Sequence, residues 1–181
     1  MTRYVALLRA VNLAGKNSVA MAELRVWIEE LGFSAPRTLL NSGNAVFGGR
    51  EQPTARVEAT LEAEAKKRFK FAIPFVVRTA DDMARLVDRN PFAREAASDP
   101  GHLLVVFMKG SIPPATVKAL EAKIVGREVV RADGAHLYAV YPDGVGRSKL
   151  TAALIDRTLG MAGTGRNWNT VLKLKEMACL P

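Results

Sequence analysis

The sequence predicts an α+β fold with two ferredoxin-like units of the βαββα type packed together and an extra C-terminal helix. Apolar runs of strand length alternate with segments of helical periodicity, and one order of elements occurs twice. A polar connection at residues 94–101, which contains Asp-Pro-Gly, separates the two sets. We therefore expect two domains, residues 1–93 and residues 94–181. The repeat concerns the order of elements rather than the residues themselves.

The first half predicts the order β-α-β-β-α-β, followed by a short linking helix. The apolar run at residues 4–8 is typical of a buried strand. Apolar residues at helical spacing predict a helix at residues 20–31, and Gly32 would end it in the left-handed conformation. The other expected elements are strands at residues 37–40, 45–47 and 73–77, a helix beginning near Pro53, and a helix capped by Thr79 and Asp82.

The second half predicts the order β-α-β-β-α, followed by an extra helix. Leu103–Met108 is an apolar run of strand length, and Asp133 with Gly134 indicates a hairpin turn. The other expected elements are a helix beginning at Pro113, strands at residues 127–131 and 136–141, a helix capped by Ser148, and a last helix beginning near Asn167.

Composition narrows the class of protein. The 181 residues are 49% hydrophobic, which suits a globular fold with a real core, and they contain no 18-residue apolar run. We expect no membrane span, no signal peptide and no membrane partner. The single cysteine, Cys179, cannot form an internal disulfide, which fits a cytoplasmic protein.

The net charge of +8 favours an anionic partner. Residues 147–181 contain six Lys or Arg side chains against two Asp or Glu, so the positive charge of the second half is concentrated near the C-terminus. The alternative is that the excess reflects arginine usage alone.

Four polar clusters in expected loops or helix starts are the candidate site: residues 9–17, 41–44, 144–149 and 164–170. The expected ligand-binding residues are Arg9, Asn12, Lys16, Asn17, Ser42, Asn44, Arg147, Ser148, Lys149, Arg166, Asn167 and Trp168. We expect six of them to lie near one basic cleft between the two units, namely Arg9, Asn12, Lys16, Asn44, Arg147 and Arg166.

These clusters combine features that suit a phosphate. Glycines let backbone N–H groups approach a ligand, a helix N-terminus favours negative charge, and Arg or Lys supplies full positive charge. In the third cluster we expect the N–H groups of residues 146–148 to serve as donors, although the Walker A spacing is missing. Each cluster also has a structural alternative: a loop at residues 9–17, a hairpin turn at residues 41–44, a helix cap at Ser148, and a core anchor at Trp168.

Other catalytic patterns are weak, and catalytic residues stay unassigned. His102 and His136 lie far apart in the sequence without metal-ligand spacing, and Cys179 has no basic or glycine-rich neighbours at a helix start. We therefore predict no bound metal and no cofactor.

Three sequence blocks carry a resemblance to a known family. They are YVALLRAVN with GKN and MAEL in residues 4–24, LNSGNAVF at residues 40–47, and RNWNTV at residues 166–171. Together they resemble the bacterial DUF1697 family over nearly the whole chain. Ala10 and Leu13 depart mildly from the family pattern, where Gly and Val or Ile are expected. The resemblance implies a two-part α+β fold with ferredoxin-like halves and implies no activity.

The sequence leaves three functional interpretations open. The first is a protein that binds a phosphate-bearing small molecule or nucleotide at the basic cleft. The second is an enzyme acting on a small anionic substrate, in which Arg9, Arg147 and Arg166 would bind the anion and Lys16 or Ser42 would do the chemistry. The third is a nonspecific nucleic-acid-binding protein. The missing aromatic-rich strand motif disfavours sequence-specific RNA binding. A purely structural role for the clusters is the remaining alternative, and the oligomeric state stays open.

Overall fold

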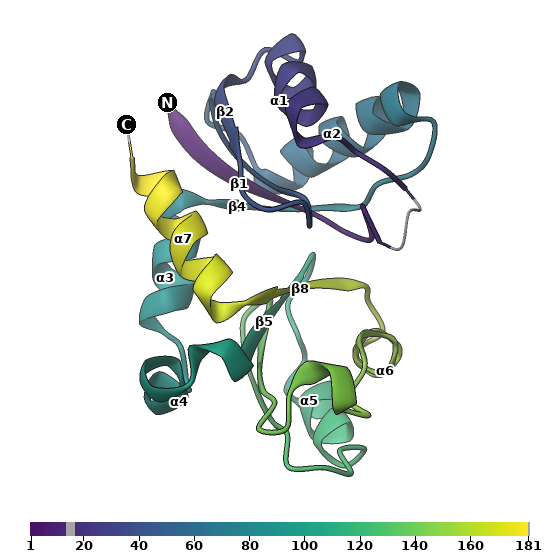
Figure 1. The fold of residues 1–181 in the computed structure, drawn as a ribbon, viewed down its shortest axis with the longest axis vertical. Helices are drawn as coiled ribbons and strands as arrows, with labels where there is room; N and C mark the ends of the chain where they lie inside the picture. The colour runs from purple at the N-terminus through teal and green to yellow at the C-terminus, as the bar shows by residue number, and fades with distance from the viewer. Residues whose placement is uncertain (14–16, 181) are drawn as a thin grey trace. The chain divides into compact units, whose positions relative to one another are not determined.

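The computed structural model describes residues 1–13 and 17–180 (Figure 1). Its contacts divide the chain into unit 1, Met1–Ala84 with Leu174–Pro181, and unit 2, Arg85–Lys173. The division runs through two helices, α3 (Ala80–Asp88) and α7 (Trp168–Cys179). The sequence-based domain boundary at residue 93 stays a prediction. No helix in the described ranges has the length and hydropathy needed to cross a bilayer.

Unit 1 is a four-stranded antiparallel sheet with helices on one face. The strands lie in the order β2-β3-β1-β4, which is the order of a ferredoxin-like βαββαβ unit. Its elements are β1 (Thr2–Leu8), α1 (Met21–Glu30), β2 (Ser34–Thr38), β3 (Asn44–Gly49), α2 (Thr54–Phe69) and β4 (Phe75–Thr79).

The core of unit 1 lies between the sheet and helices α1 and α2 (Figure 1). It is rich in aromatic rings. Trp27 of α1 contacts Phe75 of β4 with ring centroids 6.2 Å apart, and Phe69 of α2 at 5.4 Å. Phe47 of β3 lies 5.9 Å from the ring of Tyr4. These large side chains fill the space between the layers.

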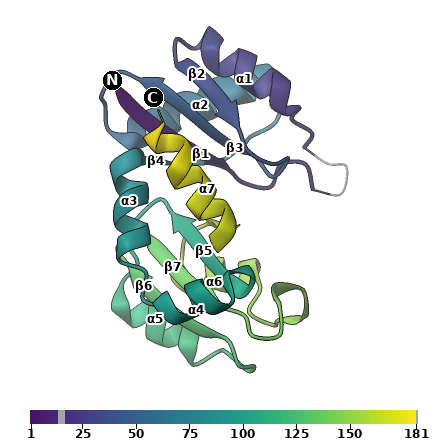
Figure 2. The same cartoon turned by 60° about the vertical axis from the view of Figure 1, so that its left-hand side comes forward.

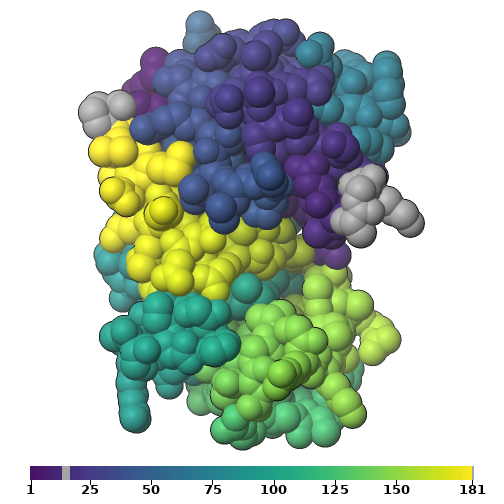
Figure 3. Space-filling view, viewed as in Figure 1, coloured from purple at the N-terminus to yellow at the C-terminus, as the bar shows by residue number. Residues whose placement is uncertain are grey.

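Unit 2 repeats this topology, with strands in the order β6-β7-β5-β8 and all neighbours antiparallel. Strands β5, β6 and β7 are labelled in Figure 2. Helices α5 and α6 cover one face of the sheet and share a core of mainly aliphatic side chains with it. Its elements are α4 (Ala93–Ser98), the short 3-10 helix η1 (Pro100–His102), β5 (Leu103–Met108), α5 (Pro114–Glu121), β6 (Val129–Asp133), β7 (His136–Val140), the short 3-10 helix η2 (Val145–Arg147), α6 (Ala152–Leu159) and β8 (Gly163–Asn167). The predicted fold class is confirmed. Figure 3 shows the chain in space-filling form, coloured by residue number.

Strand β8 was not expected from the sequence. Its segment, Gly-Thr-Gly-Arg-Asn, contains two glycines and an asparagine, which are residues depleted in strands. Pairing with β5 overrides this weak local preference, with Met108 opposite Gly163 and Val105 opposite Arg166. The second unit is therefore βαββαβ followed by a helix, as the first is.

The strand registers allow individual residues of the two units to be matched. In unit 1, β1 pairs with β4 so that Val5 lies opposite Arg78. In unit 2, β5 pairs with β8 so that Val105 lies opposite Arg166. Aligning these two pairs places β4 (Phe75–Thr79) on β8 (Gly163–Asn167) residue by residue. The two arginines are therefore structural counterparts.

Several local predictions are confirmed. Gly32 has φ +86° after α1, and Gly134 has φ +56° between β6 and β7, as the left-handed stop and the hairpin turn require. The Asp82 carboxylate accepts from the Thr79 N–H at 2.9 Å, and the Asp82 N–H donates to the Thr79 hydroxyl at 3.1 Å. These reciprocal bonds are the expected capping box.

Two local expectations are corrected. Thr151, not Ser148, caps α6, because its hydroxyl accepts from the Leu154 N–H. Ser148 instead ends the short 3-10 helix that precedes α6. Both residues are good cap formers, so local sequence could not choose between them. The connection at residues 94–101 also carries most of helix α4 and the start of η1.

Candidate ligand cavity

The first two polar clusters meet within unit 1. The side-chain amide of Asn12 donates to the carbonyl oxygens of Val19 and Asn41 at 2.9 and 2.8 Å. Its oxygen accepts from the Val19 N–H at 2.8 Å. The Leu8 N–H donates to the Gly43 carbonyl at 2.9 Å. These bonds join the loop after β1 to the turn before β3.

The polar residues of these two clusters bind mainly to the backbone around them. Asn44 is fully buried and donates to the Leu39 carbonyl at 2.7 Å and to the Ser42 hydroxyl at 3.1 Å. Asn17 donates to a backbone carbonyl at 3.3 Å. The Arg9 side chain is half-buried. Lys16 lies outside the described residues.

Left-handed backbone is concentrated in the same two segments. Ala10, Asn12 and Asn17 have φ between +51° and +55°, and Leu40 has φ +58°. Gly43, with φ +80°, has no room for a side chain, because a Cβ there would lie 2.7 Å from both Leu8 and Val11. The Gly and Asn residues of these blocks therefore meet conformational demands of the backbone.

The third cluster forms a turn on the surface of unit 2. Its Arg147 and Ser148 N–H groups donate to the carbonyls of Gly144 and Val145, so they serve the 3-10 turn. The Ser148 hydroxyl donates to the Glu128 carboxylate and accepts from the Leu150 N–H at 2.9 Å. The charged side chains of Arg147 and Lys149 are exposed.

The fourth cluster spans the end of β8 and the start of α7. Arg166 is 7% exposed, and its Nη1 donates to the Thr164 hydroxyl at 2.7 Å and the Gly165 carbonyl at 2.8 Å. Burial lowers the pKa of Arg166 to about 10, so it remains a cation at neutral pH. Asn167 caps α7 by accepting from the Asn169 N–H. Trp168 is buried, with 4% of its surface exposed.

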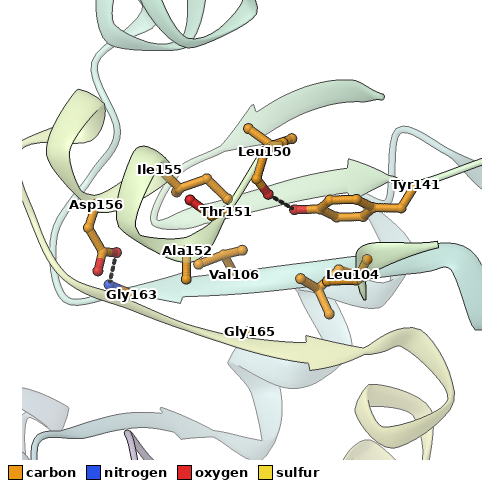
Figure 4. Close-up of a pocket in the computed structure, with 11 residues that line it drawn as sticks. Leu104, Val106, Tyr141, Leu150, Thr151, Ala152, Ile155, Asp156, Gly163 and Gly165 are labelled. Carbon is orange, nitrogen blue, oxygen red and sulfur yellow. Dashed lines mark hydrogen bonds between the residues drawn. The ribbon is translucent and has the colours of Figure 1, made fainter. Parts of the chain in front are cut away.

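A cavity of about 250 Å³ lies in unit 2 between its sheet and the segment that leads into α6 (Figure 4). Its floor is the face of β5 and β8, and its walls come from η2, α6 and Tyr141. The lining residues are Leu104, Val106, Tyr141, Val145, Leu150, Thr151, Ala152, Ile155, Asp156, Gly163 and Gly165. The third and fourth clusters therefore border one cavity, through Val145 and Gly165.

Two glycines of β8 create this space. By the shared register, Gly163 and Gly165 occupy the places that Phe75 and Val77 occupy in β4. Both unit 1 side chains are fully buried in its core. Without them, the corresponding space in unit 2 stays open between β8 and α6. A Cβ at Gly163 would lie 2.2 Å from the sulfur of Met108, so that glycine is also required by close packing.

The polar groups of the cavity are held by hydrogen bonds. The Tyr141 hydroxyl donates to the Leu150 carbonyl at 3.1 Å, and the Asp156 carboxylate accepts from the Gly163 N–H at 2.9 Å (Figure 4). Burial, with a smaller contribution from Glu128, raises the pKa of Tyr141 to about 12. The phenol is therefore neutral at physiological pH.

The sequence did not single out most of these lining residues, because they are apolar or glycine. A signal was nevertheless present. In both halves an arginine is followed by a helix-capping residue, Thr79 or Asn167, at the end of the last strand of the unit. Aligning the two halves on this feature sets Phe-Val-Val-Arg-Thr against Gly-Thr-Gly-Arg-Asn and exposes the change from large to small residues.

In the described ranges, no group of three or more His, Cys, Asp or Glu side chains is placed to hold a metal ion. The expected absence of a metal and of a cofactor stays a prediction. The expectation that six residues face a cleft between the units also stays a prediction.

The family model described as "Protein of unknown function (DUF1697)" matches residues 1–138. The chain belongs to the DUF1697 family. The match confirms the family resemblance, while most residues that line the cavity lie beyond residue 138.

A solved structure supports the fold of this DUF1697 protein. The conserved bacterial protein SP0830 from Streptococcus pneumoniae has a TM-score of 0.78 over 98% of this chain and 98% of that chain, at 24% sequence identity. At this identity the likeness concerns the fold alone. None of the curated proteins matches the chain.

Proposed function

We propose that this DUF1697 protein binds a small, largely apolar molecule that carries one negatively charged group, in the cavity of unit 2. The observation that carries the proposal is the cavity itself, which exists because Gly163 and Gly165 replace the large residues Phe75 and Val77 of the repeat. Its volume of about 250 Å³ is close to the lower end of ligand pockets, about 300 Å³.

The apolar character of the ligand is argued from the lining. Leu104, Val106, Leu150 and Ile155 supply aliphatic surface, and a ligand group that covers this surface is removed from water. A whole nucleotide is too polar for most of this lining. A phosphate or carboxylate group would therefore lie at the opening, with the apolar part of the molecule inside.

The negative charge is argued from the cations beside the cavity. Arg147 and Lys149 are exposed in the segment between Val145 and Leu150, which both line the cavity. Arg166 lies next to Gly165 and donates to its carbonyl. The Asp156 carboxylate opposes them and is engaged by the Gly163 N–H. Glu128 also lies close by, as the acceptor of the Ser148 hydroxyl, and Asp143 near Arg147 is paired with Arg127. The cations Arg147, Lys149 and Arg166 therefore face the two carboxylates of Asp156 and Glu128, and this excess favours an anionic group.

Binding is favoured over catalysis because the polar side chains of the lining already serve the fold. Thr151 caps α6, Tyr141 donates to a backbone carbonyl, and Asp156 accepts from the edge of β8. A general acid or base must reach the proton that it transfers. These side chains instead bind backbone groups.

Six-carbon aliphatic probes test this proposal. Hexanoate, hexyl phosphate and hexanol would be titrated into the ¹⁵N-labelled protein, with the amide signals of Gly163 and Gly165 as local reporters. The anionic probes are expected to shift both signals at millimolar or lower concentration and to raise the melting temperature by mass action.

The variant Gly165→Val fills the cavity with the side chain that β4 carries at the same place. A Cβ at Gly165 lies 3.1 Å from the Leu104 side chain, which is flexible enough to move. We expect at least a tenfold loss of affinity. Gly101→Ala is the control, because the nearest atom to its new Cβ is 4.0 Å away. Unchanged affinity in Gly165→Val, or no binding by wild type, would contradict the proposal.

A further inference from the structure

Two carboxylates from α2 accept hydrogen bonds from the outer N–H groups of β4, an edge strand of unit 1. Glu62 accepts from the Phe75 N–H at 2.9 Å, and Glu58 accepts from the Val77 N–H at 2.8 Å. The Nη1 of Arg78 donates to the Val77 carbonyl at 2.8 Å, which places its charge beside Glu58. Burial lowers the pKa of Arg78, and the Glu58 carboxylate opposes that shift. The Glu58 carboxylate therefore accepts from the Val77 N–H and also interacts electrostatically with the Arg78 cation.

Unit 2 repeats only part of this arrangement. Asp156 of α6 accepts from the Gly163 N–H at 2.9 Å, as Glu62 does from Phe75. Arg166 donates to the Gly165 carbonyl at 2.8 Å, as Arg78 does to Val77. The helix position four residues before Asp156 is Ala152.

Ala152 therefore stands where unit 1 has the carboxylate of Glu58. The helix faces support this alignment, because Leu61 and Ile155 are both buried one residue before the matching carboxylates. Because Gly165 matches Val77 in the shared register, its N–H points outward from the edge of the sheet. It points toward Ala152, as the Val77 N–H points toward Glu58.

The place of the missing carboxylate is open. Glu58 is 6% exposed and Val77 is fully buried, whereas Ala152 and Gly165 are both exposed and both line the cavity (Figure 4). Ala152 is also the first residue of α6, and the N-terminal end of a helix favours negative charge. Gly165 and the start of α6 thus border this space, and the Arg166 guanidinium lies beside it on the Gly165 carbonyl. The carboxylate that lines the cavity is that of Asp156, one helical turn further along α6.

We propose that this space is a carboxylate subsite, in which a ligand carboxylate takes the place that Glu58 holds in unit 1. The carboxylate accepts from the Gly165 N–H and pairs with Arg166, while the rest of the molecule extends over Leu104 and Val106. This assignment rests on the proposed function and adds to it the class of ligand, a small aliphatic or aromatic carboxylic acid. The match to one Glu side chain favours a carboxylate over the larger phosphate.

Three exposed-site variants test the subsite. Ala152→Glu supplies a built-in carboxylate, Ala152→Gln supplies the same bulk without charge, and Ala153→Glu adds the same charge one position further along α6. Both alanines are exposed, so we expect these substitutions to preserve the fold. Hexanoate and the neutral hexanol are the probes, and their affinities are measured from the Gly163 and Gly165 amide signals.

The expected pattern is specific to the subsite. Wild type binds hexanoate at least tenfold more tightly than hexanol. Ala152→Glu weakens hexanoate at least tenfold and hexanol less than threefold, while Ala152→Gln weakens hexanoate less than Ala152→Glu does. Ala153→Glu leaves hexanoate within twofold of wild type. Ala152→Glu also melts about 2–4 °C above Ala153→Glu, because only its carboxylate reaches the Gly165 N–H.

The outcomes separate the two proposals. If hexanoate binds wild type and Ala152→Glu leaves its affinity unchanged, or Ala153→Glu weakens it equally, the anion lies elsewhere and the subsite is wrong while the cavity proposal stands. If neither probe shifts the glycine signals of wild type, the cavity proposal fails and the subsite fails with it.

Discussion

The two units share one topology and one strand register. They differ in how the last strand packs against the helix before it, which is α2 in unit 1 and α6 in unit 2. In unit 1, Phe75 and Val77 fill the core beneath β4, and Glu58 and Glu62 engage its edge N–H groups. In unit 2, glycines at the matching positions leave a cavity, and only Asp156 remains of the two carboxylates. The contrast teaches that one unit of a repeat can serve as the standard of comparison for the other. Unit 1 shows which side chains unit 2 lacks at the matching positions.

The connection after the first strand is more elaborate in unit 1 than in unit 2. Unit 1 has a long connection between β1 and α1, in which Asn12 binds the backbone of Val19 and Asn41. The corresponding connection in unit 2, between Met108 and Pro114, is short. The polar family blocks of unit 1 therefore hold backbone segments together, whereas the cavity of unit 2 lies where its last strand has glycines.

The largest effect is expected where the two cores differ most. Phe75→Ala removes a buried ring that contacts Trp27, and it should lower the free energy of unfolding by about 3–5 kcal/mol through lost burial and an unfilled space. Urea denaturation followed by circular dichroism measures the change.

The matching variant in unit 2 is Gly163→Ala, where the added methyl would overlap Met108. Overpacking should cost about 1–3 kcal/mol. Loss below about 1 kcal/mol in Phe75→Ala would mean that unit 1 does not depend on the side chain that unit 2 lacks.

A smaller effect concerns Tyr141, whose place in unit 1 is taken by Gly49. Burial raises the Tyr141 pKa from 10 to about 12, so the unfolded chain loses this proton first as the pH rises. The stabilisation is therefore complete below pH ~10 and is lost as the pH rises toward ~12.

The test compares wild type with Tyr141→Phe, which cannot ionise. The difference in their free energies of unfolding should move by about 2 kcal/mol against wild type between pH ~9 and pH ~11.5. A constant difference over that range would show that the phenol is not protected by the core of unit 2.

The smallest expected change in stability tests whether Glu62 at the edge of β4 and Asp156 at the edge of β8 have matching roles. Glu62→Gln and Asp156→Asn each replace a charged acceptor of an edge N–H with a neutral one. Each should lower the free energy of unfolding by about 1 kcal/mol. Glu64→Gln is the control, because its ion pair with Lys67 is solvent-exposed and should change stability by less than about 0.5 kcal/mol. A loss in Glu62→Gln without one in Asp156→Asn would break the proposed correspondence.

Features that depend on neighbouring residues were predictable from the sequence. The left-handed stop at Gly32, the turn at Gly134 and the capping box of Thr79 with Asp82 each involve residues within one turn of one another. Their physical causes are steric freedom and local hydrogen bonds, which a short segment contains in full. The ferredoxin-like order of elements followed from the same local patterns.

Features that depend on distant partners were decided only by the tertiary structure. Strand β8 forms against its weak local preference because β5 offers a complete ladder of partners. The cavity arises because the chain brings Gly163 and Gly165 beneath α6, where the absence of side chains becomes a space. Nothing in the segment itself distinguishes glycines that line a cavity from glycines of a loop. That distinction needs the register, since it is set by which residues face them across the sheet and from the helix above.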